Sequence, residues 1–220
     1  MNKRVKVWDL PIRLFHWSLV SLLGGLWWTA SEGEMEWHMI LGFGLGSLLM
    51  FRIVWGLIGS DTARFSHFLQ TPKDVLQYAA TLPENGIKPH FGHNPLGGYM
   101  VIILLLTLTV QFVTGLFATD EVFVEGPLYS YVSTDVADWM TWLHKQNVNW
   151  LLFLIALHLL AVAIHLIKGD SLLKPMLSGS RRDIVSQSAR FSPAWLAWVL
   201  VAGIGGVSGY FLIWPVYSAL

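Results

Sequence analysis

The sequence predicts an all-α integral membrane protein. Its 220 residues are 54% hydrophobic and only 13% charged, and they include 12 tryptophans. Soluble globular domains carry charge on about 25% of their residues. The chain has no cysteine, which excludes disulfides and iron–sulfur ligation by thiolates. Its formal net charge is zero, so nothing in the composition indicates a nucleic-acid partner.

Five apolar stretches are long enough to cross a bilayer, which takes about 20 residues of helix. They are residues 11–30, 37–58, 96–117, 143–167 and 193–214. Basic residues precede the first stretch, as they precede the apolar part of a signal peptide. Arg13 and His16 lie inside this stretch, however, and argue against a cleaved leader. We therefore expect five membrane helices.

The loops between these stretches differ sharply in charge. The segments after the first and third stretches are acidic and contain neither Lys nor Arg. The basic residues lie before the first stretch and after the second and fourth, at Lys3, Arg4, Lys6, Arg64, Lys73, Lys88, Lys168, Lys174, Arg181, Arg182 and Arg190. Because Lys and Arg concentrate in cytoplasmic loops, this pattern predicts a cytoplasmic N-terminus. Five crossings then place the C-terminus in the periplasm.

Four histidines are expected at two depths in the membrane. His144 and His158 are 14 residues apart, so on one helix they share a face and lie about 21 Å apart along the axis. In the predicted orientation, His38 and His144 lie near the outer surface, and His16 and His158 lie about 8 Å from the cytoplasmic edge. Two imidazole pairs at two depths suit two haem groups, each with two axial histidines. The alternative is structural: each histidine would only hydrogen-bond a neighbouring helix.

Further residues near the cytoplasmic side are candidates for contacts with such cofactors. His165 lies on the same face as His158, about 10 Å beyond it, and is a candidate propionate or quinone contact, or simply an edge residue. Arg13, Arg52 and Lys168 are candidate partners for haem propionates. Their alternative role is that of ordinary positive anchors on the cytoplasmic side.

Small residues and loop histidines complete the set of candidates. Glycines that follow the ligand histidines by four or eight residues would permit close helix approach, as they also do in plain helix packing; they are Gly24, Gly42 and Gly46. The loop histidines His67, His90 and His93 are expected to be solvated or to structure the loop. The segment "HFGHNP" is an additional candidate for the quinone site.

Four blocks of the sequence resemble the bacterial cytochrome b561 family, which includes the b-type cytochrome subunits of nickel–iron hydrogenases. They are "VKVWDLPIRLFHW", "FRIVWGLIGSDTARFSHF", "GHNPLGGYMVIILLLTLTVQFVTGLF" and "LHKQNVNWLLFLIALHLLAVAIHLIKGDSLLKPMLSG", within residues 5–182. The resemblance implies a four-helix haem-binding transmembrane bundle in the bacterial inner membrane. It also implies two haem b groups with the axial ligands His16, His38, His144 and His158, paired His16 with His158 and His38 with His144.

The family resemblance divides the chain into a di-haem domain over residues 1–182 and a C-terminal extension over residues 183–220 with the fifth helix. It implies electron transfer between membrane quinone and a redox partner, as a quinol or quinone oxidoreductase. The outer loops could steer a basic periplasmic cytochrome c; their acidic residues are Glu32, Glu34, Glu36, Asp120, Glu121, Glu125, Asp135 and Asp138. Two alternatives remain: a haem b membrane-anchor subunit of a larger oxidoreductase such as a hydrogenase, and a histidine-based metal transporter.

Overall fold

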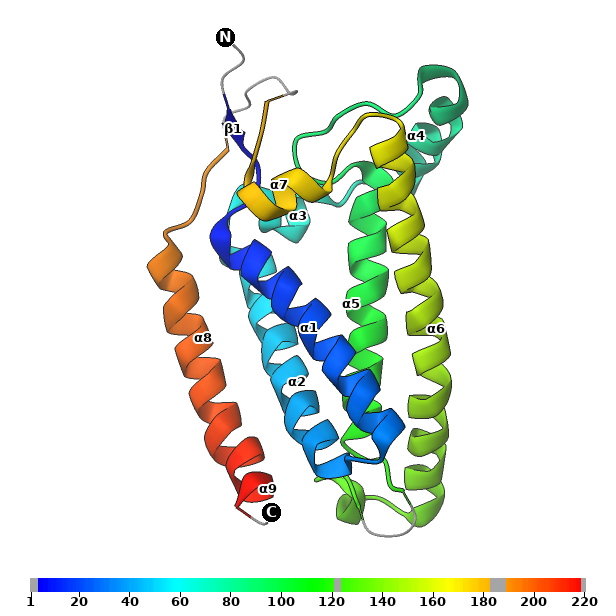
Figure 1. Ribbon diagram of the computed structural model, residues 1–220, viewed down its shortest axis with the longest axis vertical. Helices are drawn as coiled ribbons and strands as arrows, with labels where there is room; N and C mark the ends of the chain where they lie inside the picture. Colours follow the sequence, from blue (N-terminus) through cyan, green and yellow to red (C-terminus); the bar gives the residue numbers. More distant parts are fainter. Residues whose placement is uncertain (1–3, 121–123, 183–188, 219–220) are drawn as a thin grey trace. The chain divides into compact units, whose positions relative to one another are not determined.

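The computed structural model describes residues 4–120, 124–182 and 189–218, so Lys3 and Glu121 lie outside the described residues. The elements follow one another along the chain as labelled in Figure 1. They are β1 (Val5–Lys6), α1 (Leu10–Glu32), α2 (Met35–Ile58), η1 (Asp61–Ala63), α3 (Phe65–Phe68), α4 (Pro72–Asn85), α5 (Pro95–Gly115), η2 (Tyr129–Tyr131), α6 (Thr134–Ile167), α7 (Leu173–Ser178), β2 (Ser180–Arg181), α8 (Ala194–Ser208), η3 (Gly209–Ile213) and α9 (Trp214–Tyr217).

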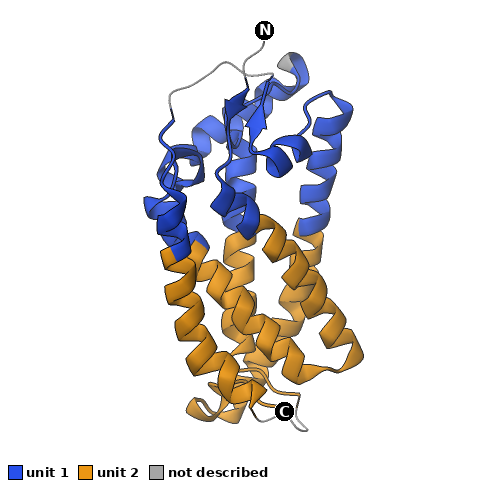
Figure 2. Cartoon of the chain, turned by 60° about the vertical axis from the view of Figure 1, so that its left-hand side comes forward, with its two compact units in different colours: residues 1–15, 52–103, 155–198 blue, residues 16–51, 104–154, 199–220 orange. Residues whose placement is uncertain are grey.

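The chain forms two compact units, coloured separately in Figure 2. Unit 1 comprises Met1–Phe15, Arg52–Ile103 and Ile155–Trp198, and unit 2 comprises His16–Phe51, Leu104–Leu154 and Val199–Leu220. Each of the five long helices contributes one part to each unit. These units therefore divide the helices along their length, and the predicted domain boundary after residue 182 stays a prediction.

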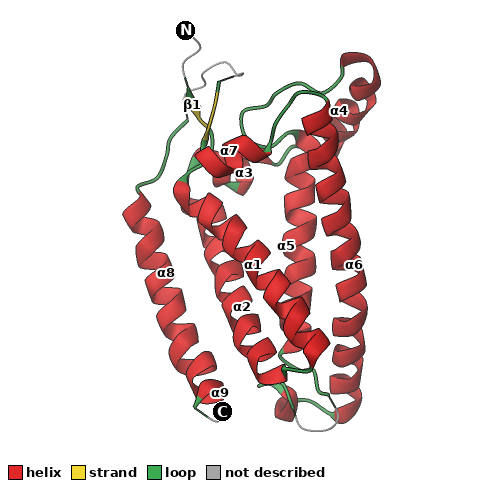
Figure 3. Ribbon diagram, in the orientation of Figure 1, coloured by secondary structure: helices red, strands yellow, loops and turns green. Residues whose placement is uncertain are grey.

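Helices make up most of the described chain (Figure 3). The four that are long and apolar enough to cross a membrane lie at Met35–Ile58, Pro95–Gly115, Thr134–Ile167 and Ala194–Tyr217, among the residues that the structure describes. α1 is also a continuous helix of 23 residues, but it is not one of these four. It carries Arg13, His16 and Glu32, which lower its mean hydropathy. The protein is thus a multi-pass membrane protein, and a fifth crossing stays a prediction.

Two of the predicted helix limits differ from the structure. α6 begins at Thr134 rather than at residue 143. Residues 134–142 contain no Gly or Pro that would interrupt a helix, and Asp135 lies in the first turn. An acidic residue there is favourable for the helix dipole. The fifth apolar stretch is not one regular α-helix: α8 ends at Ser208 and continues through five residues of π-helix into α9.

The loop between α2 and α5 contains helices that the hydrophobic pattern did not predict. α4 begins after Thr71, whose side-chain oxygen accepts a hydrogen bond from the backbone N–H of Asp74 at 3.3 Å. Pro72 occupies the first turn of α4, where a missing N–H costs nothing. α4 is thus a short helix outside the membrane helices, in a segment expected to be loop.

Unit 1 is organised around a buried carboxylate at the start of α1. Asp9 is only 2% exposed. Its side chain caps α1 by accepting a hydrogen bond from the backbone N–H of Ile12 at 2.9 Å, and it accepts a second from the indole N–H of Trp55 at 3.0 Å. Trp55 is fully buried at the end of α2. β1 pairs with β2 in an antiparallel register that sets Val5 opposite Arg181.

Unit 2 contains the tight turn between α1 and α2. Gly33 has φ +77° and the N–H of Glu34 donates to the carbonyl of Thr29 at 2.9 Å, the arrangement of a glycine-terminated helix. α2 and α5 approach closely at Gly46, where a Cβ would stand 2.4 Å from the ring of Phe112. Gly46 is therefore a packing glycine of this unit.

Candidate functional site

His38 and His144 face each other in unit 2, one from α2 and one from α6. Their ring centres are 6.4 Å apart and the ring planes are nearly perpendicular, at 83°. The Nδ1 atom of His38 lies 3.0 Å from the carbonyl oxygen of Leu26 and 3.3 Å from the hydroxyl of Thr29, both on α1. A carbonyl can only accept, so Nδ1 carries the proton and Nε2 keeps its lone pair.

His144 is held in the same way by α5. Its Nδ1 atom lies 2.9 Å from the carbonyl oxygen of Gln111 and 3.2 Å from the hydroxyl of Thr114. The side-chain amide of Gln111 donates to the other ring nitrogen, Nε2, at 3.0 Å, while its oxygen accepts from the amide of Asn147 at 2.7 Å. Both imidazoles are thus fixed in one tautomer by a backbone carbonyl of a neighbouring helix.

Gly115 is a close neighbour of the His144 ring. A Cβ at this position would stand 2.9 Å from Cε1 of His144. We expect Gly115→Ala to destabilise the protein by about 1–3 kcal/mol, because the added methyl must displace the ring or the backbone. Thermal unfolding in detergent measures this. The matched control is Gly24→Ala, where nothing lies within 4 Å of the added atom. Equal unfolding temperatures of the two variants would contradict the expectation.

Unit 1 contains buried cationic donors. Arg52 is only 3% exposed and its guanidinium lies 4.8 Å above the ring centre of Phe65. Arg13 is half-buried and donates through one terminal nitrogen to the carbonyl of Leu177. Within the described part of the chain, Nη1 of Arg52 and Nε of Arg13 are buried and have no hydrogen-bond partner. Donors of this kind are rare without a partner, and the site is suited to an anionic group.

His93 lies near Arg52, and of the two roles expected for the loop histidines, solvated or structuring the loop, it has the second. Its ring packs between Trp8 and Phe68, with both ring centres 4.7 Å away, and its Nδ1 atom is buried without a hydrogen-bond partner among the described residues. Burial, together with the nearby charge of Arg52, lowers the pKa of His93 to about 3. His93 is therefore neutral at physiological pH. The hydrophobic pattern had missed it because the packing partners come from distant parts of the chain.

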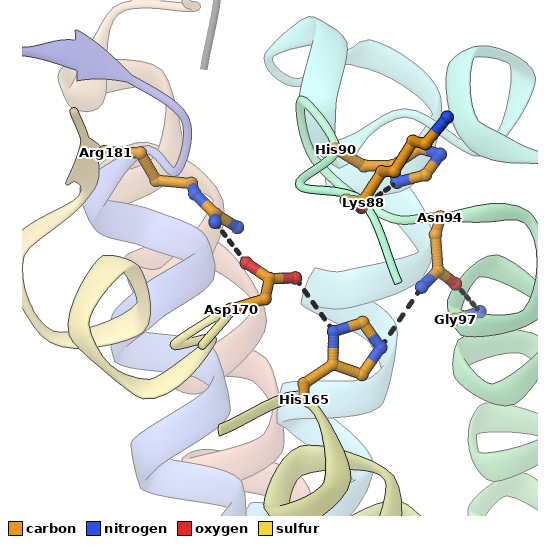
Figure 4. A network of polar contacts seen from close by, with 7 residues as sticks. All are labelled: Lys88, His90, Asn94, Gly97, His165, Asp170 and Arg181. Atoms are coloured by element: carbon orange, nitrogen blue, oxygen red, sulfur yellow. Dashed lines mark hydrogen bonds and ion pairs between the residues drawn. The ribbon is translucent and has the colours of Figure 1, made fainter. Parts of the chain in front are cut away.

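The remaining candidate residues are distributed over both units. His16, in unit 2, is half-buried and packs edge-on against Trp17, with ring centres 5.0 Å apart. His158, in unit 1, is half-buried and interacts electrostatically with His93. Lys168 is exposed after the end of α6. His165 belongs to a polar network with Asp170 (Figure 4).

The geometry can be compared with known proteins. The family model of prokaryotic cytochrome b561 matches residues 7–179, which is most of the chain. The chain belongs to the prokaryotic cytochrome b561 family. No curated protein and no solved structure gives a match. This cytochrome b561 is accordingly a membrane b-type cytochrome in electron transfer, and its family implies that it binds haem b.

His38 and His144 of this cytochrome b561 are the residues that would hold one haem iron. With metal–nitrogen bonds of about 2.0 Å, two imidazoles on opposite sides of a metal have ring centres about 6.3 Å apart, close to the observed 6.4 Å. Gly42, one turn after His38, has no neighbouring heavy atom within 4 Å of where a Cβ would stand. Ligation does require the amide of Gln111 to leave Nε2 of His144, which it contacts here.

The buried donors of unit 1 fit the carboxylates of a haem. Propionates would supply acceptors for Nη1 of Arg52, Nε of Arg13 and, if it carries the ring proton, Nδ1 of His93. Arg13 and Arg52 were candidates from their charge alone. His93 is an addition from the structure, because only its burial between Trp8 and Phe68 distinguishes it from the other loop histidines.

The sequence predicted no role for two further residues of this cytochrome b561. Gln111 and Asn147 are buried, 9% and 8% exposed, and connect α5 with α6 beside His144. Asn147 also donates to the carbonyl of Thr107 at 3.0 Å. In the sequence Gln111 is a polar amide within an apolar stretch, whereas Asn147, about one turn after His144, lies among other polar residues and gives no such signal. Such residues tend to hold ligands in position.

Proposed function

We propose that this cytochrome b561 binds two haem b groups and transfers electrons between membrane quinone and a periplasmic redox partner. The observation that carries the proposal is the opposed pair His38 and His144, in which a carbonyl of another helix accepts from Nδ1 of each ring, so that Nε2 keeps the lone pair a metal would need. Bis-histidine ligation leaves no open iron position, which favours electron transfer over oxygen chemistry. Haem iron supplies the one-electron redox chemistry, and the chain supplies ligation and surroundings.

We assign His38 and His144 to the periplasmic haem, and His16 and His158 to the cytoplasmic haem. The charge distribution supports this orientation in the inner membrane. Lys145 is the only Lys or Arg of unit 2, and all the other basic residues belong to unit 1. Because Lys and Arg favour the cytoplasmic side, the proposed topology has a cytoplasmic N-terminus, five crossings and a periplasmic C-terminus.

The residues of unit 1 bind and orient cofactor and substrate in this proposal. Arg13 and Arg52 hold propionates of the cytoplasmic haem, and Lys168, which is exposed after the end of α6, is assigned the same role. His165 contacts the quinone headgroup or a propionate. The neighbouring loop residues of "HFGHNP" complete the proposed quinone site at the same end of the helices.

The acidic residues of unit 2 support docking of a basic periplasmic cytochrome c. The described ones that are exposed are Glu32, Glu34, Glu36, Glu125, Asp135 and Asp138. We expect the rate at which the reduced protein reduces a basic cytochrome c to fall about tenfold or more as ionic strength is raised, because salt screens the steering field. Stopped-flow absorbance measures this, with ferricyanide, a small anion, as the comparison acceptor. A rate that is insensitive to salt would argue against this docking surface.

A reduced-minus-oxidised visible spectrum of the purified chain, with a pyridine haemochromogen assay, tests the proposal. We expect low-spin haem b at about two per chain. Folded protein without haem, produced with an adequate haem supply, would contradict the proposal and favour the histidine-based metal transporter. Haem-loaded protein that acts only after co-purifying with a large periplasmic enzyme would instead indicate a membrane-anchor subunit, as in a hydrogenase.

A further inference from the structure

A polar network lies at the end of α6 in unit 1 and uses none of the four proposed haem ligands (Figure 4). The Nδ1 atom of His165 lies 2.8 Å from Oδ2 of Asp170, and Arg181 donates to Oδ1 of the same carboxylate. The side chains of Asp170 and Arg181 are each only 4% exposed, and that of His165 is 12% exposed. Beyond His165, the amide nitrogen of Asn94 lies 3.5 Å from Nε2.

The local sequence explains why Asp170 reaches back to His165. Gly169 has φ +85°, its N–H donates to the carbonyl of Leu166, and the N–H of Asp170 donates to the carbonyl of His165 at 2.8 Å. These two hydrogen bonds form a Schellman motif, which ends the helix and folds the chain back over the last helical turn. The β1–β2 pair then brings Arg181 to the other carboxylate oxygen.

The contacts define where the protons are. A carboxylate only accepts, so both Arg181 and Nδ1 of His165 donate to Asp170. Arg181 balances the charge of Asp170, and in a neutral imidazole held this way the lone pair lies on Nε2. Asn94 contacts this lone pair only at the long limit of a hydrogen bond, because the amide oxygen is tied to the N–H of Gly97 at 2.7 Å. Nε2 of His165 is therefore the exchangeable position of the network.

Other titratable groups face the network from α4 and the following loop. The buried hydroxyl of Tyr78 has no hydrogen-bond partner among the described residues. Burial, and then the charge of Asp170, raise the pKa of Tyr78. Its ring packs edge-on against His90, which donates to the carbonyl of Lys88 at 2.8 Å. Lys88 is exposed, and His90 is half-buried.

We propose that His165 is a proton-transfer residue for the quinone reaction, and that Asp170 and Arg181 are positioning residues that keep the proton-accepting nitrogen, Nε2, free. This inference rests on the proposed function, which supplies the quinone. A carboxylate behind Nδ1 fixes the tautomer and stabilises the imidazolium that forms when Nε2 takes a proton, as in other histidine–carboxylate pairs.

The step balances in the direction of quinol oxidation. A quinol loses two electrons, one at a time, to ferric haem b, and loses two protons. One O–H bond breaks as Nε2 of His165 forms an N–H bond, and this proton is later released to water. The second proton leaves the other quinol oxygen directly to water. Quinone reduction is the reverse, with the same atoms.

The test measures how fast a short-chain quinol analogue reduces the haems of the full-length protein, across a range of pH. His165→Gln keeps a hydrogen-bonding side chain but cannot carry the proton, so we expect a rate about 10²-fold lower and a flattened pH profile. Asp170→Asn should lower the rate about tenfold and move the pH midpoint down, since the imidazolium loses its counter-charge. Arg181→Lys should retain most of the rate. The control is His67→Gln, an exposed histidine of the same unit.

Haem content and the dithionite-reduced spectrum separate this inference from the proposed function. If both are normal in every variant and the quinol kinetics change as expected, the inference is supported. Unchanged kinetics and pH profile in His165→Gln would overturn it. Loss of haem in His165→Gln, with normal quinol kinetics in Asp170→Asn, would also overturn it in favour of a structural role. A wild-type protein whose haems dithionite reduces but the quinol does not would overturn the quinone function itself.

Discussion

Replacing His38 by alanine is expected to remove one of two haem groups and leave the other. The imidazole of His38 is opposed by His144 at 6.4 Å, and alanine offers no nitrogen in its place. The haem-to-protein ratio should therefore fall from about two to about one. A pyridine haemochromogen assay on protein of known concentration measures the ratio, and the spectrum of the remaining haem should stay low-spin.

Two further variants test whether the loss of haem is specific to the His38–His144 pair. His144→Ala should produce the same loss, because both histidines serve one group in this arrangement. His67→Ala should retain all of the haem, because His67 is an exposed histidine of α3. Full haem retention in both His38→Ala and His144→Ala would contradict the assignment of this pair. Loss of all haem from folded protein would show that the two groups bind cooperatively.

Replacing Asp9 by alanine should be strongly destabilising. The substitution removes the cap of α1, leaves the indole N–H of fully buried Trp55 without an acceptor, and removes the carboxylate that interacts electrostatically with buried Arg52. Removing one member of a buried charged network costs about 3–5 kcal/mol. For a chain of this size we expect a Tm about 10 °C lower, measured as loss of the monodisperse detergent-solubilised protein on heating.

Two control substitutions distinguish the contributions of Asp9. Asp9→Asn keeps an oxygen for the α1 cap but loses the charge, so its Tm should lie between those of the wild type and Asp9→Ala. Asp74→Ala removes an exposed carboxylate from the first turn of α4 and should change stability by less than about 1 kcal/mol. If Asp9→Ala and Asp74→Ala unfold at similar temperatures, the buried network of Asp9 is not important for stability.

Several features of the protein could be predicted from local sequence alone. The apolar stretches correspond to α1, α2, α5, α6 and α8, because helix length and hydropathy are properties of consecutive residues. The family resemblance is confirmed over residues 7–179. The grouping of His38 with His144 also followed from helical spacing and depth, and the structure brings these two rings together. The partner assignment of His16 and His158 stays a prediction.

Other features depend on contacts between distant parts of the chain, and only the tertiary structure decided them. The sequence left open whether His93 is solvated or structures its loop, and only the tertiary structure shows its ring packed against Trp8 and Phe68. Gln111 and Asn147 are unremarkable as single polar residues and become meaningful only beside His144.

The polar network at the end of α6 contains both features that local sequence predicts and features that depend on tertiary contacts. Gly169 and its helix-ending turn can be read from neighbouring residues, since a glycine after a helix favours positive φ. Arg181 and Asn94 cannot, because their approach to Asp170 and His165 requires the β1–β2 pair and the start of α5 to be in place. Sequence periodicity determines which residues share a helix face, whereas packing between helices decides which polar atoms meet.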